Sequence, residues 1–254
     1  MNSFQPIRII PRLDVKNQNV IKSINLEGLR VVGNPADLAY KYYSQGADEL
    51  LYVDVVASLY GRNNLKDIVF EATKNIFVPI TVIGGIRSIQ DFKEMLLAGA
   101  DKVGVNTAAI QNPNLISELA NQFGSQSLIL SVEAKKVREN YWEVMTHNGR
   151  ENTGKNVVDW VEQCVKNGIG EIVVTSIDQE GTKSGFDLTL MKIVSEKINV
   201  PVIASGGMGS IDHSIDLIQN SAISGISMAD ILHYNRISLD EIKQKLKHNK
   251  FNVR

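Results

Sequence analysis

Short apolar runs rich in β-branched residues recur about every 30 residues along the chain. Each run is followed by a stretch in which apolar residues return at helical spacing, and this alternation predicts eight strand–helix units around a parallel sheet. Because the runs are almost continuously apolar, we expect both faces of each strand to be covered. The expected strands lie near residues 7–13, 48–56, 79–84, 101–106, 127–133, 170–176, 201–205 and 224–229.

Polar residues and glycines mark the expected helix ends. An asparagine before a proline predicts an N-cap followed by the first helical residue, and a serine can cap through its hydroxyl. A glycine after a helical stretch predicts a left-handed C-cap. These signals occur at Asn34-Pro35, Asn112-Pro113, Ser88, Ser210 and Ser238, and at Gly46, Gly99, Gly124 and Gly168. Residues 141–144 and the turn 147–150 predict a β-hairpin inserted after the fifth strand.

The chain also contains an internal repeat. Segment 78–85 (VPITVIGG) resembles segment 200–207 (VPVIASGG) at an offset of 122 residues, and the same offset pairs 48–49 with 170–171. Two similar halves without a low-complexity linker predict one closed (β/α)8 barrel, a single domain over residues 1–254. An open, doubly wound sheet is the alternative.

Composition places the chain among ordinary globular proteins. Its 254 residues are 43% hydrophobic, and the 27 basic and 28 acidic side chains nearly balance. No basic surface is expected, which argues against a nucleic-acid partner. The longest apolar runs are too short to span a bilayer, and residues 1–6 lack the pattern of an export signal. Cys164 is the only cysteine, so we expect a cytoplasmic protein in which this thiol packs on a helix.

Candidate chemistry gathers where the strands end, because reactive groups of such barrels project from the carboxyl ends of the strands. Gly84-Gly85 and Gly206-Gly207 occupy equivalent positions of the repeat. Glycine pairs leave backbone N–H groups uncovered beside a helix N-terminus, which suits phosphate, although a tight turn alone would also explain them. Two such pairs predict an elongated ligand with a phosphate at each end.

Two carboxyl groups are expected to face each other across the barrel. Asp14 and Glu133 end equivalent strands, 119 residues apart. Such a pair can divide acid and base work, or each can be an ordinary strand-end carboxylate in solvent or in a salt bridge. The histidines have no metal-ligand spacing, so we expect no metal or cofactor and interpret them as surface or packing residues: His147, His213, His233 and His248.

Eight segments, in order along nearly the whole chain, resemble the cyclase subunit of imidazole glycerol phosphate synthase. They are 8–16 (RIIPRLDVK), 84–87 (GGIR), 99–103 (GADKV), 106–109 (NTAA), 123–126 (FGSQ), 175–178 (TSID), 181–183 (GTK) and 204–207 (ASGG). The resemblance implies a (β/α)8 barrel of histidine biosynthesis that partners a glutaminase. In that family ammonia crosses the barrel and converts a bisphosphorylated ribulosyl aminoimidazole carboxamide nucleotide to imidazole glycerol phosphate and an aminoimidazole carboxamide ribonucleotide.

The resemblance also implies residue roles. Asp14 and Glu133 stand at the two catalytic positions. The substrate and phosphate positions are Gly85, Asn106 and Thr107 at one end, and Ser176, Gly181, Gly206, Gly207, Ala229 and Asp230 at the other. Arg8, Glu49, Lys102 and Glu171 match the charged ring through which ammonia enters, although four such residues would ordinarily be read as salt bridges. Asp101 matches a position that touches the glutaminase.

Four positions depart from the family pattern. Ile83 replaces the first glycine of a three-glycine strand end, Arg12 occupies a position that is usually small, Glu133 replaces aspartate and Asp230 replaces a serine. A carboxylate near a phosphate is unfavourable, so Asp230 puts the second phosphate site in doubt. The cyclase therefore has two alternatives. One is a paralogue that uses glutaminase-derived ammonia to amidate a surface-glycan sugar, and the other is a non-catalytic barrel that binds a glutaminase.

Overall fold

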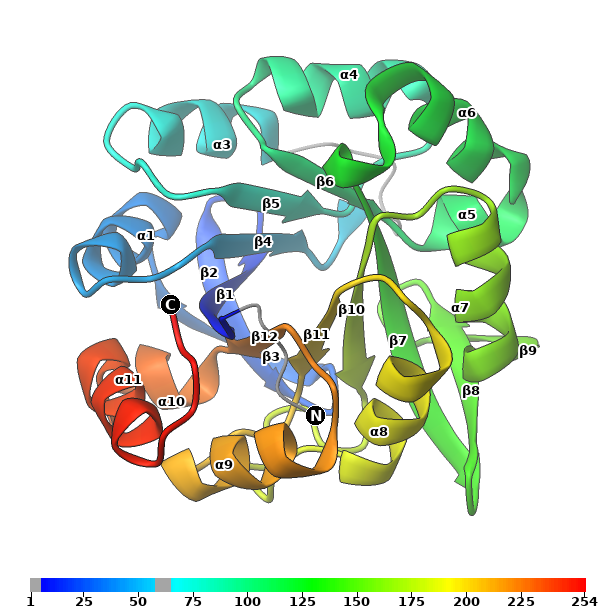
Figure 1. Cartoon of the computed structure of the whole chain (residues 1–254). Helices are drawn as coiled ribbons and strands as arrows, with labels where there is room; N and C mark the ends of the chain where they lie inside the picture. The colour runs from blue at the N-terminus through cyan, green and yellow to red at the C-terminus, as the bar shows by residue number, and fades with distance from the viewer. Residues whose placement is uncertain (1–5, 58–64) are drawn as a thin grey trace.

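Eight parallel strands close into a barrel in the computed structural model, which describes residues 6–57 and 65–254 (Figure 1). The sheet runs β1-β4-β5-β6-β7-β10-β11-β12, and β12 pairs with β1. The (β/α)8 barrel is confirmed and the open sheet is wrong. The strands are β1 (Arg8–Lys16), β4 (Leu50–Asp54), β5 (Ile80–Ile83), β6 (Lys102–Val105), β7 (Leu128–Arg138), β10 (Glu171–Ser176), β11 (Val202–Ser205) and β12 (Gly225–Met228).

Helices form a ring outside the strands. They are α1 (Pro35–Ser44), α3 (Leu65–Thr73), α4 (Ile89–Leu97), α5 (Thr107–Gln111), α6 (Asn114–Phe123), the 3-10 helix η1 (Ser125–Ser127), α7 (Val157–Lys166), α8 (Leu188–Lys197), α9 (Ile211–Asn220), α10 (Asp230–His233) and α11 (Leu239–His248). Within the described ranges, no helix is long and apolar enough to span a membrane. The expected lack of an export signal falls on residues 1–6, of which 1–5 lie outside the described residues.

The predicted caps are mostly confirmed. Asn34 and Ser88 accept hydrogen bonds from helix N–H groups, and Ser238 forms a capping box with Glu241. The predicted cap at Asn112 is wrong by one residue, because Pro113 occupies the N-cap position of α6 without a side-chain hydrogen bond. Ser210 caps α9 by position only. Cys164 is buried on α7, as expected.

Alternation along the strands divides the core into two layers. Ile9 and Leu13 of β1 face the helices, where the larger apolar cluster lies. Ile10 faces inward and belongs to a separate cluster that fills the barrel interior. That inner cluster also contains Leu51, Val53, Ile83, Ile129, Val173 and Ile203. The position of Ile10 indicates that Arg12 and Asp14, two and four residues further along β1, also point into the barrel.

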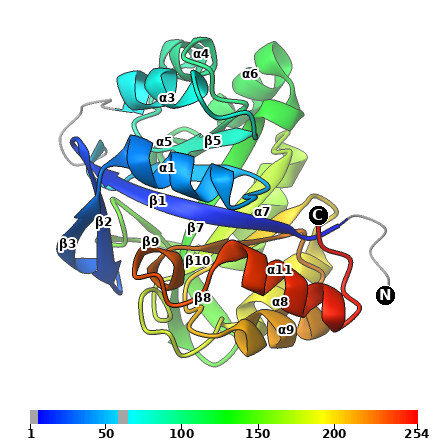
Figure 2. The ribbon, with the colours of Figure 1, turned by 90° about the vertical axis from the view of Figure 1, so that its left-hand side faces the viewer.

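Two hairpins extend the barrel at the carboxyl ends of the strands, an end that we call the mouth. The hairpin of β8 (Tyr141–Thr146) and β9 (Glu151–Asn156) continues β7, as predicted. The hairpin of β2 (Asn19–Ile24) and β3 (Glu27–Gly33) follows β1 and was not predicted. Figure 2 shows β2 and β3 at the end of the molecule opposite the two termini.

Candidate active site

Asp14 and Glu133 both lie at the mouth and point inward, four residues beyond the inner-core residues Ile10 and Ile129 of their strands. Asp14 is 2% exposed, and its Oδ1 accepts a hydrogen bond from Arg12 Nε at 2.7 Å. Glu133 is half-buried, and its Oε2 accepts a hydrogen bond from Gly149 N–H at 2.9 Å. The two carboxyl groups therefore sit in different environments: one is ion-paired and the other is not.

The Glu133 carboxyl is suited to proton transfer near neutral pH. Burial raises the pKa of Glu133 to about 7, although the Gly149 N–H and the charge of Arg12 oppose the rise. The negative charge of Asp14 adds to it. A group whose pKa lies near the working pH can both take and give a proton. This places an acid–base group at one of the two positions that the sequence singled out.

The first glycine pair borders an open cavity of about 140 Å³. Gly84 and Gly85 have φ angles of 110° and 75°, values that favour glycine, and their backbone lies at the cavity wall. Asn106, Thr107 and Glu133 also line it. Oδ1 of Asn106 is buried and has no hydrogen-bond partner among the described residues. The structure thus brings the predicted residues Gly85, Asn106 and Thr107 together beside Glu133.

Residues of the β8–β9 turn complete this cavity, and sequence reasoning missed them. His147 and Asn148 line it, and His147 N–H donates a hydrogen bond to Thr107 Oγ1 at 3.3 Å. His147 was interpreted as a surface or packing residue, and the structure places it at the wall of this cavity. The predicted hairpin turn was the available signal, because a hairpin inserted after a barrel strand must project at the mouth.

The second glycine pair borders a much smaller cavity of about 20 Å³. Five of the six residues predicted for this end line it: Gly181, Gly206, Gly207, Ala229 and Asp230. The sixth, Ser176, is fully buried and does not line this cavity, because its carbonyl oxygen lies behind Gly206. The role predicted for Ser176 stays a prediction.

The charge of Asp230 is compensated. Its Oδ1 accepts a hydrogen bond from Arg236 Nη1 at 2.7 Å. The pair with Arg236 offsets the negative charge that put the second phosphate site in doubt, and phosphate binding at this site stays a prediction. Lys22 also lines the cavity and forms a buried ion pair with Glu180. These two residues were missed because they are 158 positions apart and neither carries a local motif.

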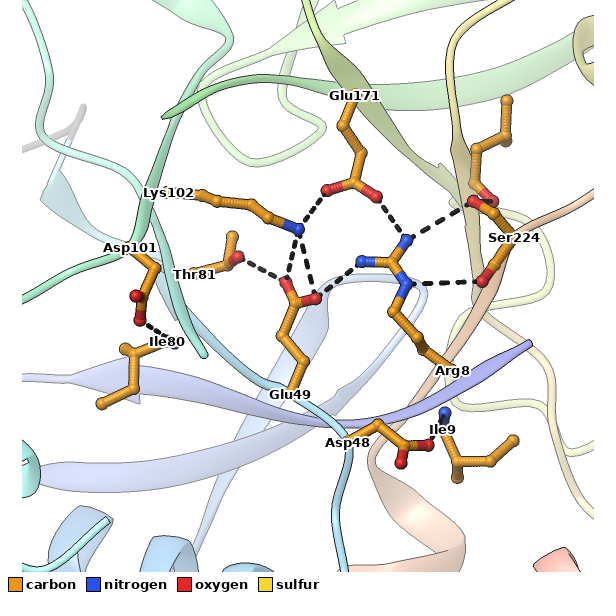
Figure 3. Close-up of polar contacts among 11 residues, drawn as sticks. Arg8, Ile9, Asp48, Glu49, Ile80, Thr81, Asp101, Lys102, Glu171 and Ser224 are labelled. Atoms are coloured by element: carbon orange, nitrogen blue, oxygen red, sulfur yellow. Dashed lines mark hydrogen bonds and ion pairs between the residues drawn. The ribbon is translucent and has the colours of Figure 1, made fainter. Parts of the chain in front are cut away.

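Four charged side chains converge at the opposite, amino-terminal end of the barrel (Figure 3). Arg8 contacts both Glu171 and Glu49, the latter at 2.7 Å. Lys102 Nζ lies 2.6 Å from Glu171 Oε2 and 3.3 Å from Glu49 Oε2. This closed set of ion pairs, which we call the ring, borders a hollow of about 380 Å³ lined by Arg8, Lys102 and Glu171.

Asp101 lies beside the ring, at the start of β6. It is exposed, and its Oδ2 accepts a hydrogen bond from the backbone N–H of Ile80 at 2.8 Å (Figure 3). One carboxylate oxygen therefore braces the start of β5, while the exposed side chain remains accessible at this end of the barrel.

Fold and site together define a (β/α)8-barrel protein with paired carboxylates between two glycine-lined cavities. Residues 8–238 match the family described as "Histidine biosynthesis protein", and the chain belongs to this family. Its similar relatives carry one name, imidazole glycerol phosphate synthase subunit HisF. The protein from Legionella pneumophila is 60% identical over 206 residues, which cover 81% of this chain and 97% of the relative. Those from Streptococcus sanguinis (strain SK36) and Bacillus cereus (strain G9842) are 44% and 43% identical, each over 97% of this chain and 98% of the relative.

Proposed function

We propose that this chain is the cyclase subunit of an imidazole glycerol phosphate synthase. Membership of the family and the shared name of the relatives support an enzyme of this type. The observation that carries the proposal is Glu133, whose pKa is raised by burial to about 7, in a mouth shared with Asp14. The substrate would be the bisphosphorylated ribulosyl aminoimidazole carboxamide nucleotide, held at both glycine pairs.

The carboxyl pair supplies the proton transfers that this reaction needs. Condensation of ammonia with a carbonyl releases a water molecule, and ring closure breaks a C–N bond that releases the aminoimidazole carboxamide ribonucleotide as an amine. Both leaving groups must gain a proton, and the incoming nitrogen must lose its protons. Glu133 can do both in turn because its pKa lies near neutrality. Asp14, once free of Arg12, is the second acid–base group. Backbone N–H groups at Gly85 and Gly207 would hold the two phosphates, which fixes the reacting carbons between the carboxyls.

A glutaminase is the partner that this function requires, and the amino-terminal end of the barrel is where we place it. The ring and its hollow lie at this end, with Asp101 beside them. Above the ring, the inner apolar cluster fills the barrel as far as the mouth. Ammonia is small and neutral, so it can cross an apolar interior that excludes ions. We further propose a single-domain, cytoplasmic protein without a nucleic-acid or membrane partner.

Lys102→Ala tests this partner interface. The variant is expected to keep turnover with added ammonium salts within about twofold and to lower glutamine-dependent turnover at least tenfold, because it opens the ring at the proposed entrance. Both activities are measured in the complex of this chain with its glutaminase partner. Lys66→Ala, which removes an exposed pair with Glu94, is the control and should change neither. A parallel fall of both activities with thermal stability would leave the ring as a structural salt bridge only.

Phosphate binding should differ between the two glycine pairs. The first cavity is about 140 Å³ and open, whereas the second is about 20 Å³ and bordered by ion pairs that must rearrange. Inorganic phosphate followed by amide NMR is therefore expected to saturate Gly85 at a lower concentration than Gly207. Saturation of Gly207 first would contradict the proposed order of affinities.

Arg12 favours one second candidate, the amidation paralogue. Its side chain fills part of the second half of the mouth, which a bisphosphorylated substrate must occupy, while the four residues of the ring, the proposed ammonia entrance, are all paired with one another. Such a paralogue would use ammonia from a glutaminase on a glycan sugar. Activity assays with the bisphosphorylated nucleotide separate the two candidates. The raised pKa of Glu133, caused by burial, argues against a barrel that only binds a glutaminase.

A further inference from the structure

Arg12 is a buried cation in the middle of the proposed active site. It is 4% exposed, and Nε donates to Asp14 Oδ1 at 2.7 Å. Nη1 donates to Thr175 Oγ1 at 2.9 Å and to Ser205 Oγ at 3.1 Å. The guanidinium therefore spans the barrel from β1 to β10 and β11. Burying a charge in this way is unfavourable unless it is paired, and Asp14 is the ion-pair partner of this guanidinium.

The same guanidinium lines the second cavity. Ser205, to which it donates, directly precedes Gly206 and Gly207. Ser227 also lines this cavity, is 1% exposed, and its Oγ has no hydrogen-bond partner among the described residues. A cation and a free buried hydroxyl thus converge beneath the glycine pair. Both are groups that bind phosphate oxygens well.

A phosphate bound directly at Gly207 needs more room than this cavity offers, although a wider hollow of about 480 Å³, lined by Lys22, Gly181 and Asp230, opens beside it. About 20 Å³ is little more than the space of one water molecule. The backbone is closely packed here, because a Cβ at Gly207 would lie 2.0 Å from the carbonyl oxygen of Gly185. What can move is the set of ion-paired side chains. Among them, Lys22 is held by Glu180 and Arg236 by Asp230, which leaves Arg12 as the cation whose partner is a proposed catalytic group.

Exchange of partners would let Arg12 serve both groups in turn. A guanidinium matches carboxylate and phosphate geometry equally, and a phosphate carries more charge than one carboxylate. When the guanidinium turns toward a phosphate at Gly207, the Asp14 carboxylate loses its ion pair. Asp14 then faces the bound substrate beside Glu133 as a free base.

We propose that Arg12 is a positioning residue that couples phosphate binding at the second glycine pair to release of Asp14. Before phosphate binds, the ion pair with Arg12 keeps the Asp14 carboxylate from accepting a proton from the substrate. After binding, Arg12 holds the phosphate and Asp14 is freed. The inference rests on the proposed function for the role of Asp14. Under this coupling, Asp14 and Glu133 are both free for proton transfer only when a phosphate of the substrate is bound at Gly207.

The test titrates inorganic phosphate into the full chain and follows NMR signals of Gly85, Gly207, the Arg12 Nε–H group and the Asp14 carboxyl carbon. The Arg12 and Asp14 signals are expected to shift with the midpoint of Gly207. Arg12→Lys should raise the phosphate concentration at the Gly207 midpoint more than tenfold, and Arg12→Met should abolish the Gly207 response. In both variants the Gly85 midpoint should stay within twofold of the wild-type value. Lys243→Met, which removes the pair with Asp48 at the other end of the barrel, is the matched control and should change neither midpoint.

The outcomes separate the inference from the proposed function. A shift of Gly207 without a shift of Arg12 and Asp14 would overturn the coupling, and so would an unchanged Gly207 midpoint in Arg12→Lys. A chain in which Gly85 responds but Gly207 does not would also overturn it, while the first cavity would keep its proposed role. If Gly85 failed to respond, the proposed function itself would be wrong. The wild-type titration decides the matter even if Arg12→Met does not fold.

Discussion

Glu133→Gln is expected to lower ammonium-dependent turnover by about 10²–10⁴-fold, the usual contribution of a general acid or base. Glutamine keeps the size of the side chain and its contact with Gly149 but cannot exchange a proton. The effect should fall on kcat, measured with ammonium chloride and saturating bisphosphorylated nucleotide. Glu143→Gln is the control, because the Glu143 carboxylate binds Asn152 and Gly154 on β9 and lies outside both cavities. Full activity of Glu133→Gln would remove Glu133 from the mechanism.

The Glu133→Gln variant should be more stable than the wild type at alkaline pH. Burial raises the pKa of Glu133 from about 4.5 to about 7, with Arg12 and the Gly149 N–H opposing and Asp14 adding to the rise. The folded chain therefore keeps a proton that the unfolded chain releases, so this group's contribution to stability falls as pH rises through that window. Glu133→Gln removes the dependence. Its melting temperature should exceed that of the wild type at pH 8 by more than at pH 5.

Asp14→Asn is a less clean test of the carboxyl pair. A strand-end carboxylate at the barrel mouth can ordinarily be replaced by its amide without cost to the fold. The structure contradicts this for Asp14, because its loss leaves the buried guanidinium of Arg12 without its ion-pair partner. A fall in activity of Asp14→Asn therefore has to be compared with its stability, whereas Glu133 has no ion pair among the described residues.

Arg8→Ala is expected to lower the free energy of unfolding by about 3–5 kcal/mol, the range for removing one partner of a buried ion pair. Arg8 contacts both Glu49 and Glu171, whose side chains are only 2% and 7% exposed. The variant would leave two buried carboxylates with Lys102 as their only cation in the ring, and it would remove the hydrogen bonds from Arg8 to Ser224. At about 2–4 °C per kcal/mol for a chain of this size, the loss is large in a thermal melt.

Two comparisons make this stability measurement specific. Lys74→Ala removes an exposed pair with Glu71 on α3 and should cost less than about 1 kcal/mol. Arg8→Lys keeps the charge but loses the forked geometry, so it should fall between the wild type and Arg8→Ala. A loss below about 1 kcal/mol for Arg8→Ala would mean that the ring does not hold the strands together at this end.

The strands were predictable because each buried barrel strand is a short apolar run in the sequence. The internal repeat located the two glycine pairs. The β2–β3 hairpin was not predictable in the same way. Its turn residues Asn25 and Leu26 have φ angles of 49° and 65°, and leucine is rare in that conformation. A turn of this type usually shows Asn-Gly. The hairpin also buries Lys22 and Ser23, polar residues that do not suggest an inward face.

The site was predictable where a strand end carries its own signal and not where distant residues meet. Asn106 directly follows β6, and Glu133 lies where β7 begins to pair with β8, so the fold alone brought them to the mouth. The partners of site residues come from elsewhere in the chain. Gly149, which donates to Glu133, lies in a hairpin turn. Arg236, which pairs with Asp230, lies beyond α10, and Glu180, which pairs with Lys22, lies in the loop after β10. Arg12 stood out in the sequence because it departs from the family pattern, but only the structure reveals its hydrogen bond to Asp14.

The most direct test of this account is turnover of the bisphosphorylated ribulosyl aminoimidazole carboxamide nucleotide by the purified chain with ¹⁵N-labelled ammonium. We predict that imidazole glycerol phosphate forms with one labelled nitrogen, together with the aminoimidazole carboxamide ribonucleotide, and that Glu133→Gln forms neither at a comparable rate. If the nucleotide binds at saturation and no labelled product forms, the chain is not a cyclase for this substrate.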